Sequence, residues 1–394
     1  MESLRGKAAV AGVGESLLGK VAGKSTFAFS ADASRAAIAD AGIEKHEIDA
    51  IFTWASGAVD PFPYYAAALA EYLGLPIRYG AALDMGGAAF GSAVGVASMA
   101  LAHGLCRTAL VVTGENRRTG KTRDGKSVWE ERGRVGYGHP EFEAPFGPVL
   151  PSFYALCAQR HMHLYGTKPE HLAEVAVTCR RHAALTPGSV QTEPITVQDV
   201  LDSPMISSPL HLLDCCPIAD GGAAVIVTTP ERARALRRPP VYVLGVGEGH
   251  THVNATWMPD MTVTGAAISG PAAFRMAGLT PRDVHTAQVY DAFTILPIMF
   301  LEDLGFCAKG AGGPFVEGGR IGLGGELPIN TDGGGLSHCQ HGSSGLWHII
   351  EAVRQVRGER GAAQVKGAQV ALAHTNGGHL ATQATVILGG EAAL

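Results

Sequence analysis

The chain has 394 residues, of which 46% are hydrophobic and only 17% are charged, so it can bury a large core. A formal net charge of −5 excludes the basic footprint of a nucleic-acid-binding protein, and no apolar run reaches the roughly 18 residues of a membrane span. Seven scattered cysteines with no CxxC spacing argue against a disulfide framework or a metal site. They predict that the protein is located in the reducing cytoplasm.

Residues 1–114 are predicted to form a first α/β unit, with strands that include residues 50–54 and 109–112. Gly12 and Gly14 follow the first predicted strand in a pattern that faintly resembles a dinucleotide-binding loop. The third glycine of such a loop is missing, and so is the acidic residue that would end a second strand. The sequence therefore does not predict a nicotinamide site.

Residues 115–207 differ in composition from the first unit. They are basic at 117–123 and contain two predicted helices, at 152–165 and 170–184. We interpret them as an inserted loop domain that lies over the functional site. The basic stretch either meets a phosphorylated cofactor or is a solvated charged loop. Residues 208–238 then return the chain to the first unit and complete the N-terminal half.

Residues 239–394, the C-terminal half, repeat the pattern of the N-terminal half. Residues 36–52 and 272–290 share an apolar helical end, an Ala-Gly step, a polar turn and an apolar strand. The glycine after each helix suits the C′ position, where a positive φ is needed. A second echo in the same order pairs residues 86–112 with residues 333–373. Two ordered echoes predict an α/β fold built from two duplicated halves of roughly 110 to 150 residues.

Three polar loops of the last third, two of them glycine-rich, each adjoin an apolar segment. They are residues 290–294, 333–342 and 375–379. Loops at the ends of strands on one scaffold commonly form a functional site together. Tyr290, His341 and His379 are side chains in these loops that can transfer a proton, and they are the first catalytic candidates. His338, in the second loop, is expected to be structural.

Several motifs carry a resemblance to a known family. They are Leu213-Asp214-Cys215-Cys216-Pro217, Tyr290-Asp291-Ala292-Phe293, Pro328-Ile329-Asn330 with Gly334-Gly335-Leu336, and residues 351–358. Together with the order of halves and insertion, they resemble the thiolase superfamily over essentially the whole chain. The likeness is greatest to the sterol carrier protein x thiolases and the bacterial lipid-transfer-protein thiolases. The resemblance implies the thiolase fold.

The cysteines of a thiolase are missing. A thiolase places its nucleophilic cysteine at the N-terminus of a buried helix, where the backbone N–H groups favour the thiolate. The matching position falls near Gly87 or Ala88, and residues 84–92 hold no cysteine. The second cysteine of the family falls near Thr375 and is absent too. The resemblance therefore implies that no covalent acyl-enzyme forms at the usual place.

One subgroup of the superfamily shares this loss, namely the aldolases of steroid side-chain degradation. They have a tyrosine at the Tyr290 position, and the resemblance implies retro-aldol cleavage of a β-hydroxyacyl-CoA into a ketone or aldehyde and a shortened acyl-CoA. Tyr290 is expected to remove the β-hydroxyl proton. His341, which matches the histidine of the thiolase Gly-His-Pro motif, is expected to polarise the thioester as it becomes an enolate. His379 and Cys339 are further catalytic candidates, and Cys339 stands where that subgroup has a second tyrosine.

The other expected site residues bind substrate. They are Asp291, Phe293, Gly377, Gly378, Gly87 and Ala88. Asp291 is expected to fix its loop by hydrogen bonding more than to touch substrate. No bound cofactor or metal is implied, because coenzyme A enters as part of the substrate. The family also implies a homodimer and a partner protein with an OB-fold, acyl-CoA-associated domain.

Two alternatives to the aldolase remain open at this point. One is a thiolase or acyltransferase with a relocated cysteine, for which Cys339 is the candidate. The other is a non-catalytic acyl-CoA-binding subunit whose partner performs the chemistry.

Overall fold

The computed structural model describes residues 3–54, 62–121, 139, 141–146, 149–339 and 344–394. Its main feature is a mixed sheet of nine strands, to which both halves of the chain contribute. In spatial order the strands are β3 (Tyr79–Ala82), β2 (Ala50–Thr53), β4 (Thr108–Asn116), β7 (Asp220–Thr228), β1 (Ala9–Glu15), β8 (Val241–His250), β11 (Thr382–Gly389), β10 (Val370–Gly377) and β9 (Thr286–Val289). The halves meet where β1 pairs with β8.

The two halves have the same order of elements, which confirms the predicted duplication. The N-terminal half runs β1, α1 (Thr26–Ala41), β2, α3 (Ala89–Ala102), β4 and β7, with α2 (Tyr65–Leu73) between β2 and β3. The C-terminal half runs β8, α9 (Ala266–Ala277), β9, α13 (Gly345–Arg357), β10 and β11. In both halves the last two of these strands pair antiparallel.

The predicted repeat of residues 36–52 and 272–290 falls on matching elements. Each segment holds a helix end, a short 3-10 helix and a strand, in that order. Gly42 and Gly278 end the two helices with φ values of 71° and 64°. These are the left-handed C′ positions that the Ala-Gly steps predicted.

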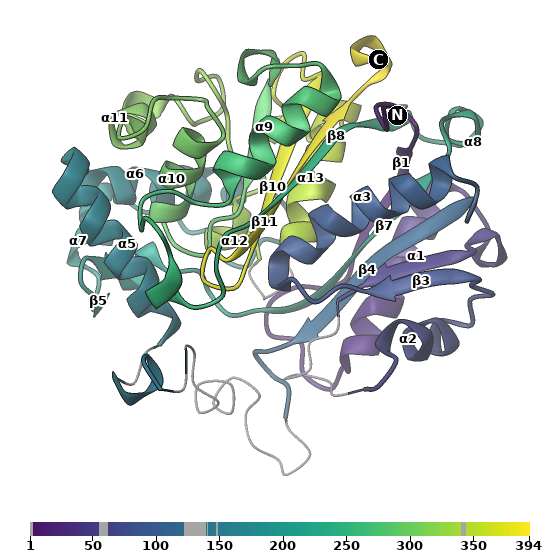
Figure 1. The fold of residues 1–394 in the computed structure, drawn as a ribbon, viewed down its shortest axis with the longest axis horizontal. Helices are drawn as coiled ribbons and strands as arrows, with labels where there is room; N and C mark the ends of the chain where they lie inside the picture. Colours follow the sequence, from purple (N-terminus) through teal and green to yellow (C-terminus); the bar gives the residue numbers. More distant parts are fainter. Residues whose placement is uncertain (1–2, 55–61, 122–138, 140, 147–148, 340–343) are drawn as a thin grey trace.

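The helices form layers on the two faces of the sheet. Helix α1 packs on β1, β4 and β7, and α9 packs on β8 and β11. Helices α3 and α13 lie on the other face, where they contact each other and strands of both halves. Figure 1 shows α3 between the two groups of strands. The buried cluster around these two central helices therefore joins the two halves into one core.

Small residues make the close packing of this central layer feasible. A Cβ added to Gly91 of α3 would lie 2.8 Å from Ala384 Cβ, and one added to Gly95 would lie 2.9 Å from Val246 Cγ1. Gly12 and Gly14 serve the same purpose on the opposite face. They lie inside β1 and not in a loop after it, and a Cβ on Gly12 would lie 2.3 Å from the Ala37 carbonyl oxygen of α1. Their spacing reflects helix-on-strand contact, which corrects the resemblance to a dinucleotide-binding loop.

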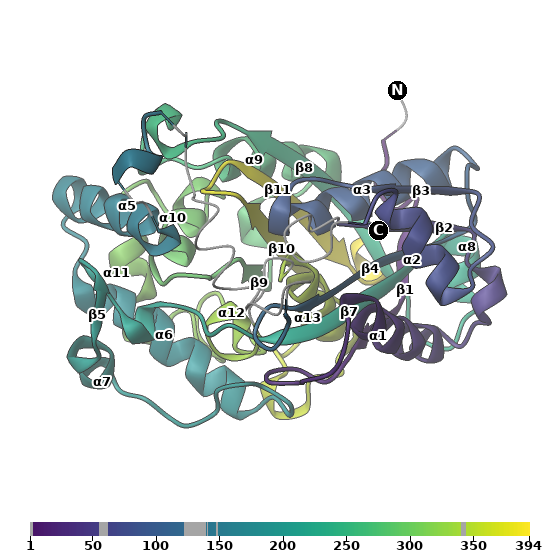
Figure 2. The same cartoon turned by 90° about the horizontal axis from the view of Figure 1, so that it is seen from below.

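The insertion contributes a group of helices at one end of the molecule, as Figures 1 and 2 show. They are α5 (Leu150–Tyr165), α6 (Pro169–Ala184) and α7 (Val197–Asp202), followed by the small sheet of β5 (Met205–Ser207) and β6 (Leu210–His211). Helix α5 packs on α10 (Ile295–Asp303), and α6 packs on α11 (Gly312–Val316) and α12 (Gly334–Ser337). The insertion thus covers the connections that follow β9.

The basic stretch at the start of the insertion begins inside the protein. Arg117 is buried, forms an ion pair with Glu115 and lies over the ring of Trp54. Residues 122–138, which hold the rest of the stretch, are outside the described residues. Arg117 therefore packs inside the protein and does not belong to a solvated loop. Among the helices of the described residues, none is long and apolar enough to cross a membrane.

Candidate active site

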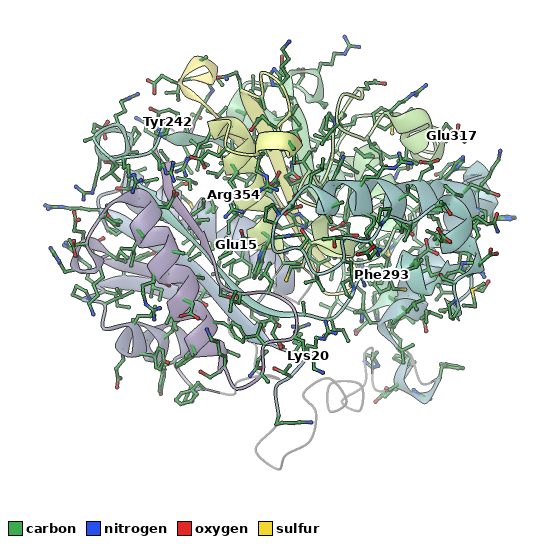
Figure 3. All side chains as sticks on the ribbon, turned by 180° about the vertical axis from the view of Figure 1, so that it is seen from behind. Glu15, Lys20, Tyr242, Phe293, Glu317 and Arg354 are labelled. Carbon is green, nitrogen blue, oxygen red and sulfur yellow. The ribbon has the colours of Figure 1, made fainter. Side chains whose placement is uncertain are left out.

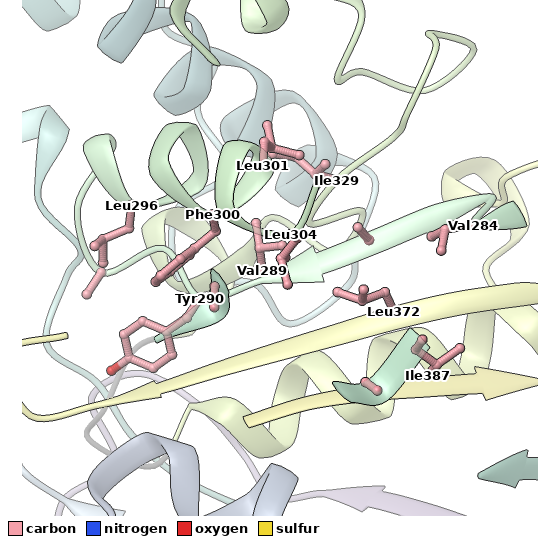
Figure 4. Close-up of a cluster of buried hydrophobic side chains, with 14 of the residues drawn as sticks. Val284, Val289, Tyr290, Leu296, Phe300, Leu301, Leu304, Ile329, Leu372 and Ile387 are labelled. Carbon is pink, nitrogen blue, oxygen red and sulfur yellow. The ribbon is translucent and has the colours of Figure 1, made fainter. Parts of the chain in front are cut away.

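Tyr290 directly follows β9, at the edge where β9 and β10 run parallel. Its backbone N–H donates to the His374 carbonyl oxygen at 3.0 Å, which ties it to β10. Figure 4 shows its ring pointing away from the aliphatic side chains of Val289 and Leu372, with the hydroxyl at the far end. The ring lies edge-on to that of His348 of α13, with 6.0 Å between centroids. Tyr290 is thus held between β10 and α13 and is buried.

Asp291 fixes the loop of residues 290–294, called here the tyrosine loop. Its carboxylate accepts hydrogen bonds from the backbone N–H groups of Gly335 and Leu336 at 2.6 and 3.2 Å, at the first turn of α12. Burial raises the pKa of Asp291 to about 7, although these two donors act in the opposite direction. Because Asp291 is fully buried, its observed contacts are those of a residue that shapes the loop.

The Asp-Cys-Cys motif holds the same loop from the other side. The Thr294 side chain donates to Asp214 Oδ1 at 2.7 Å, and the Cys216 N–H donates to the Ala292 carbonyl oxygen at 3.0 Å. Cys215 also forms an antiparallel bridge with Phe293. The motif therefore acts on the tyrosine loop through its backbone and its carboxylate. Sequence analysis found the motif but not this partner.

The second loop of the site, residues 375–379, is called here the glycine loop. It begins inside β10 and lies against the turn that precedes α3. A Cβ on Gly377 would lie 1.8 Å from the Met85 carbonyl oxygen, and one on Gly86 would lie 3.1 Å from Gly377 Cα. Gly87 and Ala88, in that turn, are buried. The structure thus brings Gly377 and Gly378 against the start of α3, at the position where the resemblance places a thiolase nucleophile.

His379 is half-buried at the end of the glycine loop. Its ring lies against that of Phe153 of α5, with centroids 4.2 Å apart. Burial lowers the pKa of His379 to about 4, with Glu143 acting in the opposite direction and His252 adding to the decrease. The imidazole is therefore neutral at pH 7. A small apolar pocket beside it is lined by Phe153, Tyr154, Cys157, Ala255, Met258, Met261, His379 and Leu380.

Cys339 and His341 belong to the third predicted loop. His341 lies outside the described residues, whereas Cys339 is described and buried. Burial raises the pKa of the Cys339 thiol well above its usual range, and the charges of Glu15, Asp332, Asp220 and Glu115 raise it further. A thiol in acidic surroundings is not activated as a nucleophile.

The other thiols are also disfavoured as thiolates. All seven cysteines are free, and burial is the largest cause of a raised pKa in each. The pKa of Cys106 rises to about 11, and those of Cys157, Cys215 and Cys307 to about 12. None therefore has the electropositive, partly exposed setting of a reactive cysteine.

Sequence analysis missed Tyr154, which the structure places between the two loops. Its hydroxyl donates to the Gly378 carbonyl oxygen at 3.0 Å, and its ring stacks on Phe293 at 4.5 Å between centroids. In Figure 3, the label of Phe293 lies next to the teal helices of the insertion. Tyr154 sits on a helix of the insertion, and its partners lie in another part of the sequence. No local pattern identifies such a residue.

Comparison with known proteins shows which families and relatives this chain resembles. Residues 247–390 match the family model for a thiolase C-terminal domain-like region. The chain is 35% identical to a steroid side-chain-cleaving aldolase of Thermomonospora curvata, over 91% of this chain and 92% of the relative. It is 34% identical to an acetyl-CoA acetyltransferase of Methanothermobacter thermautotrophicus, over 96% and 98%.

A solved structure covers the whole fold. The Ltp2-ChsH2(DUF35) aldolase superposes with a TM-score of 0.88 at 33% identity, over 99% of both chains. Its name pairs the aldolase with a second, DUF35-containing component.

Proposed function

The chain belongs to the thiolase superfamily and is an aldolase-type enzyme of that fold, and we propose that it cleaves a β-hydroxyacyl-CoA by a retro-aldol reaction. The products are a ketone or aldehyde and a shortened acyl-CoA. Two observations together carry the proposal: Gly87 and Ala88, in the turn before α3, offer no nucleophile, and a buried tyrosine, Tyr290, follows β9. A site without a nucleophile but with a buried phenol suits proton transfer better than acyl transfer.

In the proposed reaction, Tyr290 accepts the proton of the substrate β-hydroxyl. The O–H electrons form the new carbonyl as the Cα–Cβ bond breaks, and the electrons of that bond pass to the thioester as an enolate. His341 donates to the enolate oxygen, and the enolate then takes a proton at Cα. Preorganised donors of this kind contribute about 2.7 to 4 kcal/mol each to such a transition state.

The seven cysteines support a mechanism without an acyl-enzyme. Burial disfavours the thiolate at each of them, and the acidic groups around Cys339 disfavour it further. We therefore propose that Cys339 is a buried structural thiol. His379, neutral at pH 7, is proposed to line the site beside the glycine loop.

The test is product analysis. The purified protein is incubated with β-hydroxyacyl-CoA thioesters that carry either straight-chain or ring-bearing acyl groups, in the absence of free coenzyme A. Equal amounts of a carbonyl product and a shortened acyl-CoA are expected. The turnover of Cys339→Ala should stay within roughly tenfold of that of the parent protein. A parent protein that leaves these β-hydroxy thioesters intact, but cleaves a β-ketoacyl-CoA when coenzyme A is added and carries an acyl adduct on Cys339, would establish the acyltransferase alternative instead.

We also propose the assembly that the resemblance implies. The edge strand β3 carries exposed side chains, Tyr79 among them, and an open sheet edge can pair with a second copy of the chain. The name of the Ltp2-ChsH2(DUF35) aldolase supports a partner protein, since it joins that aldolase to a DUF35 component. Homodimer, partner and cytoplasmic location all stay predictions, as does the expectation that coenzyme A binds only as part of the substrate.

A further inference from the structure

Helix α5 of the insertion carries two neighbouring aromatic residues that each contact the candidate active site. Phe153 lies against the ring of His379, with 4.2 Å between centroids and 31° between planes. Tyr154 stacks on Phe293 at 4.5 Å and 25°. Both α5 residues are buried. One turn of α5 therefore contacts both the tyrosine loop and the glycine loop.

Tyr154 makes the polar part of this connection. Its hydroxyl donates to the Gly378 carbonyl oxygen at 3.0 Å. The side chain of Asn376, on the same strand end, acts to lower the pKa of the Tyr154 hydroxyl. The Asn376 side-chain oxygen is buried without a hydrogen-bond partner among the described residues. Such an unpaired acceptor next to the glycine loop can accept a hydrogen bond from a hydroxyl or N–H group of a ligand.

We propose that Tyr154 is a positioning residue for the reaction, because it links the tyrosine loop to the glycine loop and so sets the place of Tyr290 relative to Gly377 and Gly378. The inference rests on the proposed function. Phe293 and Tyr290 belong to one short loop, so a ring stacked on Phe293 restrains Tyr290. The hydroxyl bond to Gly378 restrains the other side of the site.

The electrostatics of Tyr154 are consistent with this role. Burial raises its pKa well above the usual range, and the charge of ionised Tyr290 is the next largest cause. The other titratable groups that face it are Cys157 and Cys216. Tyr154 therefore stays protonated when Tyr290 ionises, and it remains a hydrogen-bond donor throughout the reaction.

The test compares Tyr154→Phe with Tyr165→Phe in the full-length chain. Tyr165 lies in the same helix, and its hydroxyl is 3.5 Å from Thr262 Oγ1, away from both loops. Tyr154→Phe keeps the ring on Phe293 and removes only the hydroxyl. We expect kcat to fall about 10- to 100-fold with KM within about threefold, as a misplaced catalytic group predicts. Tyr165→Phe should stay within about twofold of the parent in both constants.

A second readout separates positioning from simple loss of stability. Removing the Tyr154 hydroxyl makes the surroundings of Tyr290 less polar, which disfavours the phenolate. The ascending limb of the kcat/KM profile, where activity rises as the base Tyr290 ionises, should therefore move to higher pH in Tyr154→Phe and not in Tyr165→Phe. If both variants share the kcat and the pH profile of the parent, the inference is wrong.

The inference and the proposed function can fail separately. If the parent protein cleaves no β-hydroxyacyl-CoA, the proposed function fails, and the ¹³Cζ NMR signal of Tyr290 in the ligand-free protein still tests the inference. The chemical shift of that signal, and the pH at which it titrates, should change in Tyr154→Phe and stay as in the parent in Tyr165→Phe. If Tyr154→Phe does not fold, Phe293→Leu removes the stack instead, and an unchanged Tyr290 signal in that variant overturns the link between the loops.

Discussion

At the scale of single residues, the site depends on how one tyrosine is held. The Tyr290 backbone is tied to His374 of β10, and its ring packs edge-on to His348 of α13. Asp291, the next residue, binds the start of α12 with its carboxylate. A phenol has an ordinary pKa of about 10, so a base of this kind requires a fixed position and nearby donors.

The most direct residue-level prediction concerns the Tyr290 hydroxyl. Tyr290→Phe removes the proposed base and keeps the ring against His348. We expect kcat to fall about 10²- to 10⁴-fold, the range of general base catalysis, with the affinity for the acyl-CoA nearly unchanged. Steady-state kinetics and calorimetric binding of a non-cleavable acyl-CoA measure the two effects. Equal losses of affinity and kcat would instead indicate a binding role for the hydroxyl.

At the scale of elements, the site is a contact between the end of β10 and the turn before α3. That contact depends on residues without side chains. A Cβ on Gly377 would lie 1.8 Å from the Met85 carbonyl oxygen, closer than any real contact, so β10 and the turn have to separate when one is added. The two halves of the site come from the two halves of the chain at this point.

Gly377→Ala is therefore expected to reduce activity by at least tenfold. It should also lower the free energy of unfolding by about 1–3 kcal/mol, because overpacking at a rigid contact displaces backbone. Gly322→Ala is a matched control, since its added Cβ meets only the Gly319 carbonyl oxygen, at 3.3 Å. Urea unfolding and kinetics of both variants test the contact, and an active, stable Gly377→Ala would show that the glycine loop lies elsewhere in solution.

The elements also show how far sequence reasoning reaches. The helix ends at Gly42 and Gly278 and the duplicated strands were predictable, because they depend on local periodicity and on backbone conformation at a glycine. The tyrosine loop was predictable because its polar residues directly follow an apolar strand. Tyr154 and Asp214 were not, since their partners lie 224 and 80 residues away in the sequence. Only tertiary packing on the C-terminal half brings them to the site: Tyr154 comes from the insertion, and Asp214 from the segment that follows it.

At the scale of the whole molecule, an ion pair joins β1 of the N-terminal half to α13 of the C-terminal half. Glu15 of β1 pairs with Arg354 of α13 and lies 3.2 Å from His338 Nε2; Figure 3 labels both members of the ion pair. Burial alone would raise the pKa of Glu15, but the Arg354 charge and the hydrogen bonds from His338 and Arg354 outweigh it and hold this pKa well below its usual range. The carboxylate therefore stabilises the folded chain wherever it is ionised.

A pH dependence follows from this depressed pKa. The stabilisation is present above the unfolded pKa of about 4.3, and it is lost as the pH falls below that value towards the folded pKa. Glu15→Gln should cost about 3 kcal/mol at pH 7 and less in acid, so its stability should vary less between pH 7 and pH 3 than that of the parent. Urea unfolding at several pH values measures this. The exposed Glu231 supplies the control, Glu231→Gln, and equal pH dependence of Glu15→Gln and the parent would contradict the account.

The central claim is that the chain breaks a carbon–carbon bond through a thioester enolate and without an acyl-enzyme. The measurement that tests it most directly is a single turnover of a β-hydroxyacyl-CoA in D₂O, without free coenzyme A, followed by mass spectrometry of products and protein. The account predicts a carbonyl product, a shortened acyl-CoA with one deuterium at Cα, and a protein of unchanged mass. An intact β-hydroxyacyl-CoA after the reaction, or a protein heavier by one acyl group, would contradict it.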